Sequence, residues 1–316
     1  MAEKNALNFR KELKKFGVFY TPIEVCEIMK SYIPFDNIEE VYDPTVGQGN
    51  LLSVFSDDVK KYGQELFEEE LEKAKNNLSN FEGYCGDTLT DDKFKGRKFQ
   101  CISSNPPYSV AWEPTKETLE DERFKECGIL APKSKADWAF VLHCLNHLKD
   151  DGIAIILVFP GILYRGNAEG KIREWFIRNN YIDKVIQLKS DYFVDTNIAT
   201  DILVIKKNKE TTDIFFQDLQ LEENNSRLVS FEEVEKERFT LSVSTYIEKP
   251  DTRPKINIDE LNDSILQDDV RKIEAIIKVN SLIDMLEGRD INDENSVYKK
   301  FVEQLLVVLK KYEIIK

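Results

Sequence analysis

Hydrophobic and polar residues alternate along the first two thirds of the chain in the pattern of short strands separated by longer helices. Short apolar runs predict seven strands, at residues 38–42, 62–64, 83–85, 99–103, 153–159, 182–188 and 202–205. Between them, apolar residues recur every three or four positions, which predicts helices, notably at residues 66–78, 136–148 and 168–179. This alternation is typical of an α/β fold with a parallel sheet and crossover helices.

Two features refine the expected sheet. A further helix should precede the first strand, because Thr21 is suited to cap a helix, Pro22 to occupy its first turn and Glu24 to complete a capping box. The last two predicted strands are joined by a loop too short for a crossover helix, so we expect them to be antiparallel. The sheet should therefore be mostly parallel and seven-stranded, with one antiparallel strand.

The pattern changes beyond about residue 208, where the alternation of strands and helices fades. Apolar stripes at residues 270–286 and 298–312 predict two amphipathic helices, separated by a polar break at residues 288–296. We therefore divide the chain into a domain at residues 1–210 and a C-terminal region with a helical hairpin at residues 211–316. The hairpin either packs on its own sheet domain or forms a docking surface for a partner subunit, and the pattern favours neither.

Composition limits the classes of protein that fit. With 316 residues, 41% of them hydrophobic, the chain can bury a full core without disulfides or structural metals. Its longest apolar run, residues 153–159, is far shorter than the roughly 20 residues that span a bilayer, so we expect no membrane partner. The amino terminus lacks the pattern of a secretory signal and the five cysteines form no Cys-x-x-Cys pair, which favours a reducing cytoplasm. The net charge of −14 should repel a polyanion unless basic residues are grouped or a partner supplies them.

The first site candidate lies where the first predicted strand runs into a glycine turn. Asp43 ends this strand, and Gly47, Gln48, Gly49 and Asn50 form the turn into a helix. Open α/β sheets bind ligands at this position. A dinucleotide fingerprint needs a third small residue at position 52, where this chain has a leucine, so nicotinamide binding is disfavoured.

Acidic residues follow three successive predicted strands. Asp43, Glu65 and Asp87 each stand at or just after a strand end, a spacing unlike the three or four residues that separate acids on one helix face. Glu65 lies 22 positions after Asp43, where a carboxylate can accept both ribose hydroxyls of a nucleoside-like ligand. Asp87 can accept a hydrogen bond from an adenine amino group. The three acids therefore suggest a bound adenosine.

The second site candidate is the turn formed by Asn105, Pro106, Pro107 and Tyr108 after the fourth predicted strand. The prolines alone would make only a rigid turn. An exocyclic amino nitrogen is a poor nucleophile because its lone pair is delocalised into the ring or carbonyl. If the Asn105 side-chain oxygen and the Pro106 carbonyl accept its hydrogens, the lone pair is freed, and Tyr108 can stack on the planar substrate.

Together these residues resemble the ordered motifs of amino-group DNA methyltransferases of the N6-adenine type. In particular the chain is similar to the modification subunit of type I restriction-modification systems, from about residue 16 to residue 250. The motifs that carry the resemblance are Phe19-Tyr20-Thr21-Pro22, Asp43-Pro44 with the glycine turn, Glu65, Gly86-Asp87, Asn105-Pro106-Pro107-Tyr108, Ala136-Asp137-Trp138-Ala139-Phe140, residues 158–166, Ile172-Arg173 and Leu241-Ser242-Val243-Ser244.

The resemblance implies a Rossmann-like, S-adenosylmethionine-dependent methyltransferase acting on adenine in double-stranded DNA. The residues it implies for the cofactor are Phe19, Tyr20, Thr21, Asp43, Gly47, Gln48, Gly49, Asn50, Glu65 at the ribose and Asp87 at the adenine. Those it implies for catalysis are Asn105, Pro106, Pro107 and Tyr108. Phe193, in the loop before the last predicted strand, is placed to stack on the flipped base, or equally to anchor its loop in the core.

Two departures from the family pattern bear on partners. The first motif begins at position 19, so the large helical amino-terminal region usual in these subunits is not expected, and no stretch is long enough for a target-recognition domain. Sequence specificity should therefore come from a separate specificity subunit, with a restriction subunit as a further candidate partner. The acidic net charge fits a subunit that leaves much of the DNA contact to a basic partner.

Other chemistries fit the sequence less well. His143 and His147 are one helical turn apart but lack the carboxylate of a zinc-protease motif, so no metal site is expected. The chain has no Pro-Cys dipeptide, and thus no nucleophile for carbon-5 cytosine methylation. Three alternatives stay open: methylation of a protein glutamine amide, methylation of an RNA amino group, and an inert assembly or decoy subunit.

Overall fold

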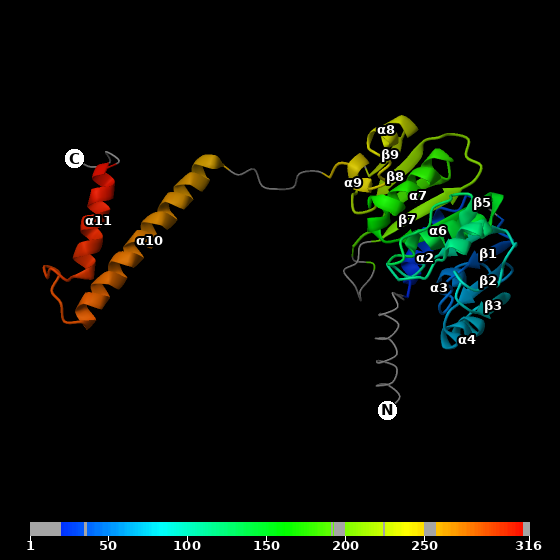
Figure 1. Cartoon of the computed structure of the whole chain (residues 1–316), viewed down its shortest axis with the longest axis horizontal. Helices are drawn as coiled ribbons and strands as arrows, with labels where there is room; N and C mark the ends of the chain where they lie inside the picture. Colours follow the sequence, from blue (N-terminus) through cyan, green and yellow to red (C-terminus); the bar gives the residue numbers. More distant parts are fainter. Residues whose placement is uncertain are drawn as a thin grey trace, which may run out of the picture. The chain divides into compact units, whose positions relative to one another are not determined.

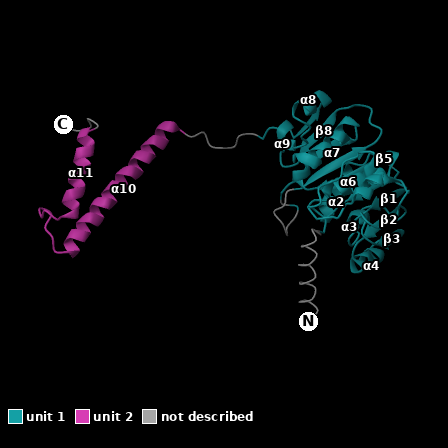
Figure 2. Cartoon of the chain, in the orientation of Figure 1, with its two compact units in different colours: residues 1–249 teal, residues 250–316 magenta. Residues whose placement is uncertain are grey.

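The computed structural model describes residues 20–34, 37–190, 192, 200–223, 225–249 and 257–311. The chain divides into two compact units, Met1–Lys249 and Pro250–Lys316, drawn in different colours in Figure 2. No helix in the described part of the chain is long and apolar enough to cross a membrane.

Nine strands of the first unit form a single sheet, in the order β3-β2-β1-β4-β5-β7-β6-β8-β9. Their bounds are β1 Glu40–Asp43, β2 Lys60–Glu65, β3 Phe81–Cys85, β4 Phe99–Ser104, β5 Leu148–Val158, β6 Ile182–Gln187, β7 Asp201–Lys206, β8 Ile214–Asp218 and β9 Ser226–Val229. The chain starts at β1 in the middle and turns back to the other side of β1 at β4, so the strand order reverses between these two strands. Ligands of open α/β sheets bind at such a switch point.

The sheet is parallel where the site candidates lie. β1 pairs in parallel with β2 and β4, β2 pairs in parallel with β3, and β4 pairs in parallel with β5. β7 runs antiparallel to both β5 and β6, as the short connection predicts. The carboxyl ends of β1 to β4 therefore meet at one edge of the sheet.

All seven predicted strands are present, but the sheet continues further than expected. β8 pairs in parallel with β6, and β9 pairs antiparallel with β8, which brings residues after position 210 into the sheet. The structure consequently places the division of the chain after Lys249, not after residue 210. The physical reason is burial, because Ile214 and Phe216 lie in the same core as the central strands.

Helices cover both faces of the sheet (Figure 1). One core lies under α2 Ile23–Ser31, α3 Asn50–Ser53 and α4 Glu68–Asn77. The other core is larger and lies under α5 Glu122–Lys125, α6 Asp137–Asn146, α7 Asn167–Arg178, α8 Phe231–Lys236 and α9 Val243–Tyr246. Two short 3-10 helices, Lys116–Glu120 and Pro160–Leu163, complete the regular structure described in this unit. The fold is thus a three-layer arrangement, in which a mostly parallel sheet lies between two layers of helices.

The start of α2 differs from its predicted form. Pro22 occupies the N-cap position, and no side chain caps this helix. Thr21 stands one residue earlier, and its hydroxyl and carbonyl oxygens accept hydrogen bonds from the side chains of Asn105 and Asn50. Thr21 therefore connects the start of α2 to α3 and to the turn after β4 instead of capping the helix.

The second unit is the predicted helical hairpin. It consists of α10 Ile258–Leu286 and α11 Val297–Lys311. Asp284 joins the two helices, because its carboxylate accepts hydrogen bonds from the Ser296 hydroxyl and from the backbone N–H groups of Val297 and Tyr298 at the start of α11. These contacts satisfy the N–H groups that the first turn of a helix leaves without partners.

Candidate active site

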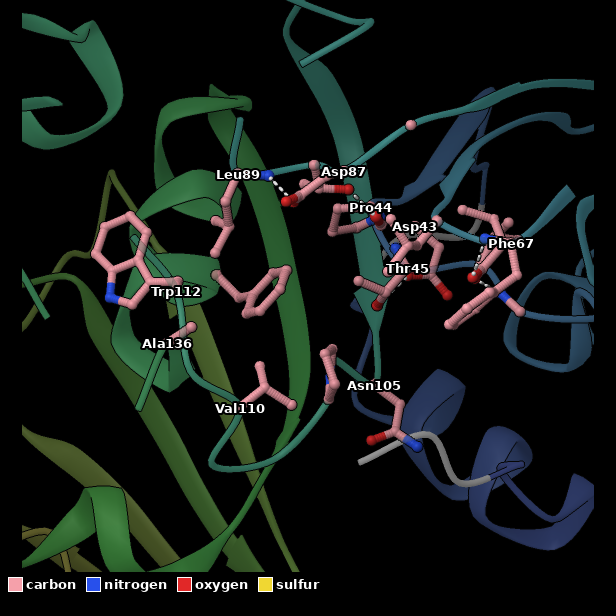
Figure 3. Close-up of a pocket in the computed structure, with 18 of the residues that line it drawn as sticks. Asp43, Pro44, Thr45, Phe67, Asp87, Leu89, Asn105, Val110, Trp112 and Ala136 are labelled. Carbon is pink, nitrogen blue, oxygen red and sulfur yellow. Dashed lines mark hydrogen bonds between the residues drawn. The ribbon is translucent and has the colours of Figure 1, made fainter. Parts of the chain in front are cut away.

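A cleft of about 470 Å³ opens at the carboxyl edge of the parallel strands. Asp43 from β1, Glu65 from β2, Asp87 after β3 and Asn105 after β4 all line it, and Figure 3 shows Asp43, Asp87 and Asn105 around the same space. Four strand ends that are far apart in sequence are thereby brought together, as the parallel topology predicts. The cleft lies at the switch point of the sheet.

Asp43 is 1% exposed, so its carboxylate is almost fully withdrawn from water. Burial raises its pKa to about 7, although hydrogen bonds from Thr45 and Ser104 favour the charged form and act in the opposite direction. The backbone N–H of Thr45 donates to Asp43 Oδ1 over 3.0 Å. A buried carboxylate at a strand end is costly to keep charged, and such a cost is typical of a ligand-binding site.

The glycine turn after β1 is held by Glu65. The backbone N–H of Gly47 donates to Glu65 Oε2 over 2.9 Å, and the N–H of Phe67 donates to Oε1 over 3.1 Å. These bonds favour the charged carboxylate, but burial outweighs them and raises the pKa of Glu65. Gly49 has φ +91°, and a Cβ there would lie 2.7 Å from Leu78, so this position requires glycine.

The loop after β3 is held in place on both sides of Asp87. Asp87 Oδ1 accepts the N–H of Leu89 over 2.9 Å. The side-chain amide of Gln64 donates to the carbonyls of Gly86 and Asp91, over 3.1 and 2.8 Å, while its oxygen accepts the N–H of Lys93. The loop that carries Asp87 is therefore fastened by a buried side chain of β2.

Asn105 lies between the cleft and the segment before α2. Its Nδ2 donates to the Thr21 hydroxyl over 2.9 Å, and its Oδ1 accepts the Tyr108 hydroxyl over 2.6 Å. Ser109, which follows the turn with φ +52°, donates its N–H to both carboxylate oxygens of Asp137, over 3.1 and 3.2 Å. The turn is thus held at both ends, and the Asn105 carboxamide is fixed in orientation.

Pro106 and Tyr108 lie beside a second, very small cavity, not in the main cleft. The Tyr108 ring is partly buried, and burial together with the charges of Asp137 and Asp201 raises the pKa of its hydroxyl far above the ordinary value. The phenol is therefore a hydrogen-bond donor at neutral pH. Its hydroxyl donates to Asn105 Oδ1, which helps to fix the carboxamide oxygen in orientation.

The structure brings most of the predicted site residues to the main cleft. Those that line it are Tyr20, Thr21, Asp43, Gly47, Gln48, Asn50, Glu65, Asp87, Asn105 and Pro107. Gly49 lies in the same turn but not on the cleft wall. Phe19 and Phe193 lie outside the described residues.

One wall of the cleft was not predicted to belong to the site. It is apolar and consists of Leu89, Val110, Trp112, Ala136 and Phe140, most of them visible in Figure 3. Trp112 is 8% exposed and donates its indole N–H to the Pro132 carbonyl over 3.1 Å. In the sequence, Trp112 stands between the Asn105 turn and the motif at residues 136–140, and it does not follow a predicted strand. Its place at the cleft therefore could not be predicted from the strand pattern.

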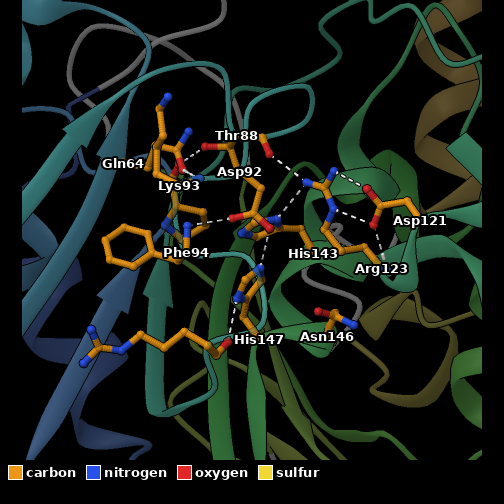
Figure 4. Close-up of polar contacts among 12 residues, drawn as sticks. Gln64, Thr88, Asp92, Lys93, Phe94, Asp121, Arg123, His143, Asn146 and His147 are labelled. Atoms are coloured by element: carbon orange, nitrogen blue, oxygen red, sulfur yellow. Dashed lines mark hydrogen bonds and ion pairs between the residues drawn. The ribbon is translucent and has the colours of Figure 1, made fainter.

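His143 and His147 do meet an acid, although no metal site was expected. Their ring nitrogens and a carboxylate oxygen of Asp92, which belongs to the segment between β3 and β4, lie within 4.8 Å of one another (Figure 4). His147 contacts Asp92 Oδ2 over 3.0 Å and the Arg97 carbonyl over 2.8 Å, and His143 contacts the Tyr42 hydroxyl over 3.1 Å. These ring nitrogens are therefore engaged in hydrogen bonds within the protein.

With this geometry established, comparison with known proteins defines the class. The fold is that of S-adenosylmethionine-dependent methyltransferases. It is shared with a solved structure from Listeria monocytogenes, proposed to be a class I enzyme of this kind, at a TM-score of 0.53 and 19% identity, covering 66% of this chain and 70% of that one. The family model for N-6 DNA methylases matches residues 5–270, and the chain belongs to this family.

Its relatives are subunits of restriction systems. The methylase subunit of the type I restriction enzyme MpnII from Mycoplasma pneumoniae is 34% identical over 327 aligned residues, covering 84% of this chain and 60% of that protein. The solved methyltransferase subunit of a type I system from Streptococcus thermophilus has a TM-score of 0.66 at 31% identity, covering 73% of this chain and 59% of that one. The chain thus spans about 60% of the length of these relatives.

Proposed function

We propose that this chain transfers a methyl group from S-adenosylmethionine to the N6 amino group of adenine in double-stranded DNA, as the modification subunit of a type I restriction-modification system. The observation that carries the proposal is the placement of the Asn105 carboxamide at the cleft that Asp43, Glu65 and Asp87 also line. A methyl donor that contains adenosine and the amino group that receives the methyl would therefore meet at the carboxyl edge of the sheet.

The cleft fits the cofactor by its donor set. The Asp87 carboxylate would accept from the adenine amino group, and Glu65 from the ribose hydroxyls. Asp43, Tyr20, Thr21 and the glycine turn would hold the methionine part, and the apolar wall with Trp112 would cover the adenine ring. When bound, the sulfonium supplies an activated methyl group.

In this proposal Asn105 activates the amino group of the target adenine. Its Oδ1 and the Pro106 carbonyl would accept the two hydrogens of the adenine amino group, which draws the nitrogen lone pair out of conjugation. Held in this way, the amino nitrogen would be oriented to accept the methyl group; the C–S bond would break as the N–C bond forms, the sulfur would leave as a neutral thioether, and one amino proton would pass to solvent. Asn105 would hold the amino group because its own carboxamide is fixed by Thr21 and Tyr108.

The flipped base needs an aromatic surface on at least one face. Tyr108 would supply it on one side and Phe193 on the other. In the structure the Tyr108 hydroxyl contacts Asn105, so the aromatic ring and the amino-group acceptor are already coupled before any base arrives.

The hairpin unit is where we expect a partner subunit to dock. Large apolar side chains remain exposed on α10 and α11, among them Leu266 at 64%, Met285 at 77%, Leu286 at 85% and Val307 at 66%. Acidic residues accompany them on the first half of α10, where Asp259, Glu260, Asp263, Asp268 and Asp269 are all exposed. An amphipathic, basic helical segment of a specificity subunit fits this surface, and a restriction subunit would join the assembly thereafter.

The proposal places the assembly in the cytoplasm, where its DNA substrate is found.

The test is transfer of labelled methyl from S-adenosylmethionine to unmethylated genomic DNA by the purified chain, with nucleoside analysis of the product. N6-methyladenine supports the proposal. The assay is repeated with the specificity protein encoded beside this chain, and product formed only then supports the dependent-subunit form of it. Label in glutamine or in RNA, or none in either assay, contradicts the proposal in favour of a protein methyltransferase, an RNA methyltransferase or an inert subunit.

A further inference from the structure

Arg123 is a buried cation next to the cofactor cleft that the proposed chemistry does not use. Its side chain is 7% exposed, and it belongs to α5, in the segment between the Asn105 turn and α6. An arginine has five N–H donors, and each of them would otherwise need water. Burying this charge costs free energy, so its contacts within the folded chain must replace the hydrogen bonds that water would make.

All five donors have a partner in the described structure. Nε and Nη2 form a bidentate pair with Asp121, over 2.9 and 2.7 Å. Nη1 donates to the Thr88 carbonyl over 2.7 Å and Nη2 to the Leu89 carbonyl over 2.9 Å. The second Nη1 hydrogen points to His143 Nδ1 over 3.3 Å, as Figure 4 shows.

The residues that Arg123 holds belong to the loop that carries Asp87. Thr88 and Leu89 immediately follow Asp87, and all three line the cleft. The far end of the loop is held by the contact between His147 and Asp92, and its backbone by Gln64. Arg123 therefore fastens the backbone carbonyls in the middle of this loop from a distant segment of the chain, while the Thr88 hydroxyl donates to the Pro44 carbonyl.

We propose that Arg123 is a positioning residue for the adenine end of the cofactor site: through the Thr88 and Leu89 carbonyls it holds the loop in the conformation in which Asp87 faces the cleft. The inference rests on the proposed function, because it takes the cofactor to be S-adenosylmethionine. Arg123 itself does not line the cleft. Its effect is expected on cofactor affinity and not on the chemical step.

The histidines behind Arg123 complete this arrangement rather than a metal site. Since a guanidinium only donates, His143 accepts at Nδ1 and carries its proton on Nε2, toward the Tyr42 hydroxyl. A divalent cation between His143, His147 and Asp92 would lie close to the Arg123 charge and would replace hydrogen bonds already made. Burial lowers the pKa of His143 well below its usual range, in agreement with a neutral ring.

The test is Arg123→Lys, which keeps the charge but removes the fork that reaches two carbonyls and a carboxylate at once. We expect the Kd for S-adenosylmethionine, measured by calorimetry, to rise about tenfold, with kcat at saturating cofactor within about twofold of wild type. Arg178→Lys is the matched control, because Arg178 is exposed, and its ion pairs with Glu174 and Glu235 and its contact with the Phe239 ring involve no residue that lines the cleft. Its Kd should stay within about twofold of wild type.

A double-mutant cycle separates positioning from general destabilisation. If Arg123 acts through Asp87, then Asp87→Ala should raise the Kd, and Arg123→Lys added to it should raise the Kd by no more than about twofold further. Asp121→Asn, which weakens the hold on the guanidinium from a partly exposed position, is a second and milder variant, expected to raise the Kd in the same direction.

Three results would overturn the inference while leaving the proposed function intact. They are an unchanged Kd in Arg123→Lys with wild-type melting temperature, a fall in kcat without a change in Kd, and fully multiplicative effects of the Asp87 and Arg123 substitutions. Failure of the wild-type chain to bind S-adenosylmethionine at all would instead contradict the proposed function itself, so the two failures are distinguishable.

Discussion

The two units of this chain treat their apolar residues in opposite ways. In the first unit the central strands are buried on both faces, and Leu157 and Ile202 are 0% exposed. In the hairpin, Leu286 is 85% exposed and Met285 is 77% exposed, and Asp284 is the buried residue of α10 within the described structure. The first unit therefore completes its own core, whereas the hairpin taken by itself leaves large apolar side chains exposed.

This difference assigns the two proposed functions, methyl transfer and partner association, to different units of the chain. The cleft is built from strand ends whose positions are fixed by the sheet, so its chemistry should depend on the first unit alone. Partner association should depend on the hairpin, where burial is incomplete. Substitutions in each unit can therefore break one function without the other, and the predictions below follow this contrast from the largest expected effect to the smallest.

Removal of the Asn105 carboxamide should have the largest effect. Asn105→Ala deletes one acceptor for the amino group, and we expect the methyl-transfer rate to fall by about 10²- to 10³-fold. Cofactor affinity should change by only a few-fold, because the acids that would hold the cofactor are untouched. Single-turnover transfer and calorimetric binding measure the two quantities, and full activity in this variant would contradict the mechanism.

Neutralising Asp43 should raise stability and remove function together. The pKa of this buried carboxyl is raised from 3.8 to about 7, so the folded chain holds the proton more tightly than the unfolded chain. The stabilising contribution of protonated Asp43 is therefore fully present below pH 4 and is lost as pH rises through 7. Asp43→Asn has no proton to lose, and at pH 8 we expect its free energy of unfolding to exceed that of wild type by on the order of 3 kcal/mol, a difference that vanishes toward pH 4.

Asp201→Asn is the matched control for this experiment. Burial and the charge of Asp218 raise the pKa of Asp201 to about 7, and Asp201 is 3% exposed, but it does not line the cleft. Both variants should gain stability at pH 8 in urea titrations, whereas only Asp43→Asn should lose binding of S-adenosylmethionine. Equal cofactor binding in the two variants would place the cofactor elsewhere.

The sequence predicts the parts of the molecule that depend on local pattern. The seven strands and the acids at their ends follow from apolar runs, and the parallel topology then brings Asp43, Glu65 and Asp87 together. β9 escapes prediction because Ser226–Val229 is short, lies at the edge and exposes three of its four residues. Trp112 and Arg123 escape because their roles come from tertiary contacts with Pro132, Thr88 and Leu89, which no spacing in the sequence records.

The smallest effect on the enzyme itself should come from the hairpin. Leu286→Ser changes a side chain that is 85% exposed, so we expect the free energy of unfolding of the first unit to change by less than about 0.5 kcal/mol and methyl-donor affinity to stay at the wild-type level. Leu157→Ala, at a fully buried position near the carboxyl end of β5, should instead cost about 2 to 5 kcal/mol. The measurement that tests the docking role of Leu286 is co-purification with the specificity subunit proposed as partner, which should weaken in Leu286→Ser and persist in Asn105→Ala. Wild-type partner binding in Leu286→Ser and in equivalent substitutions of the neighbouring exposed apolar residues would contradict the docking role of the hairpin. The difference in burial between the two units would then not reflect a division between catalysis and partner binding.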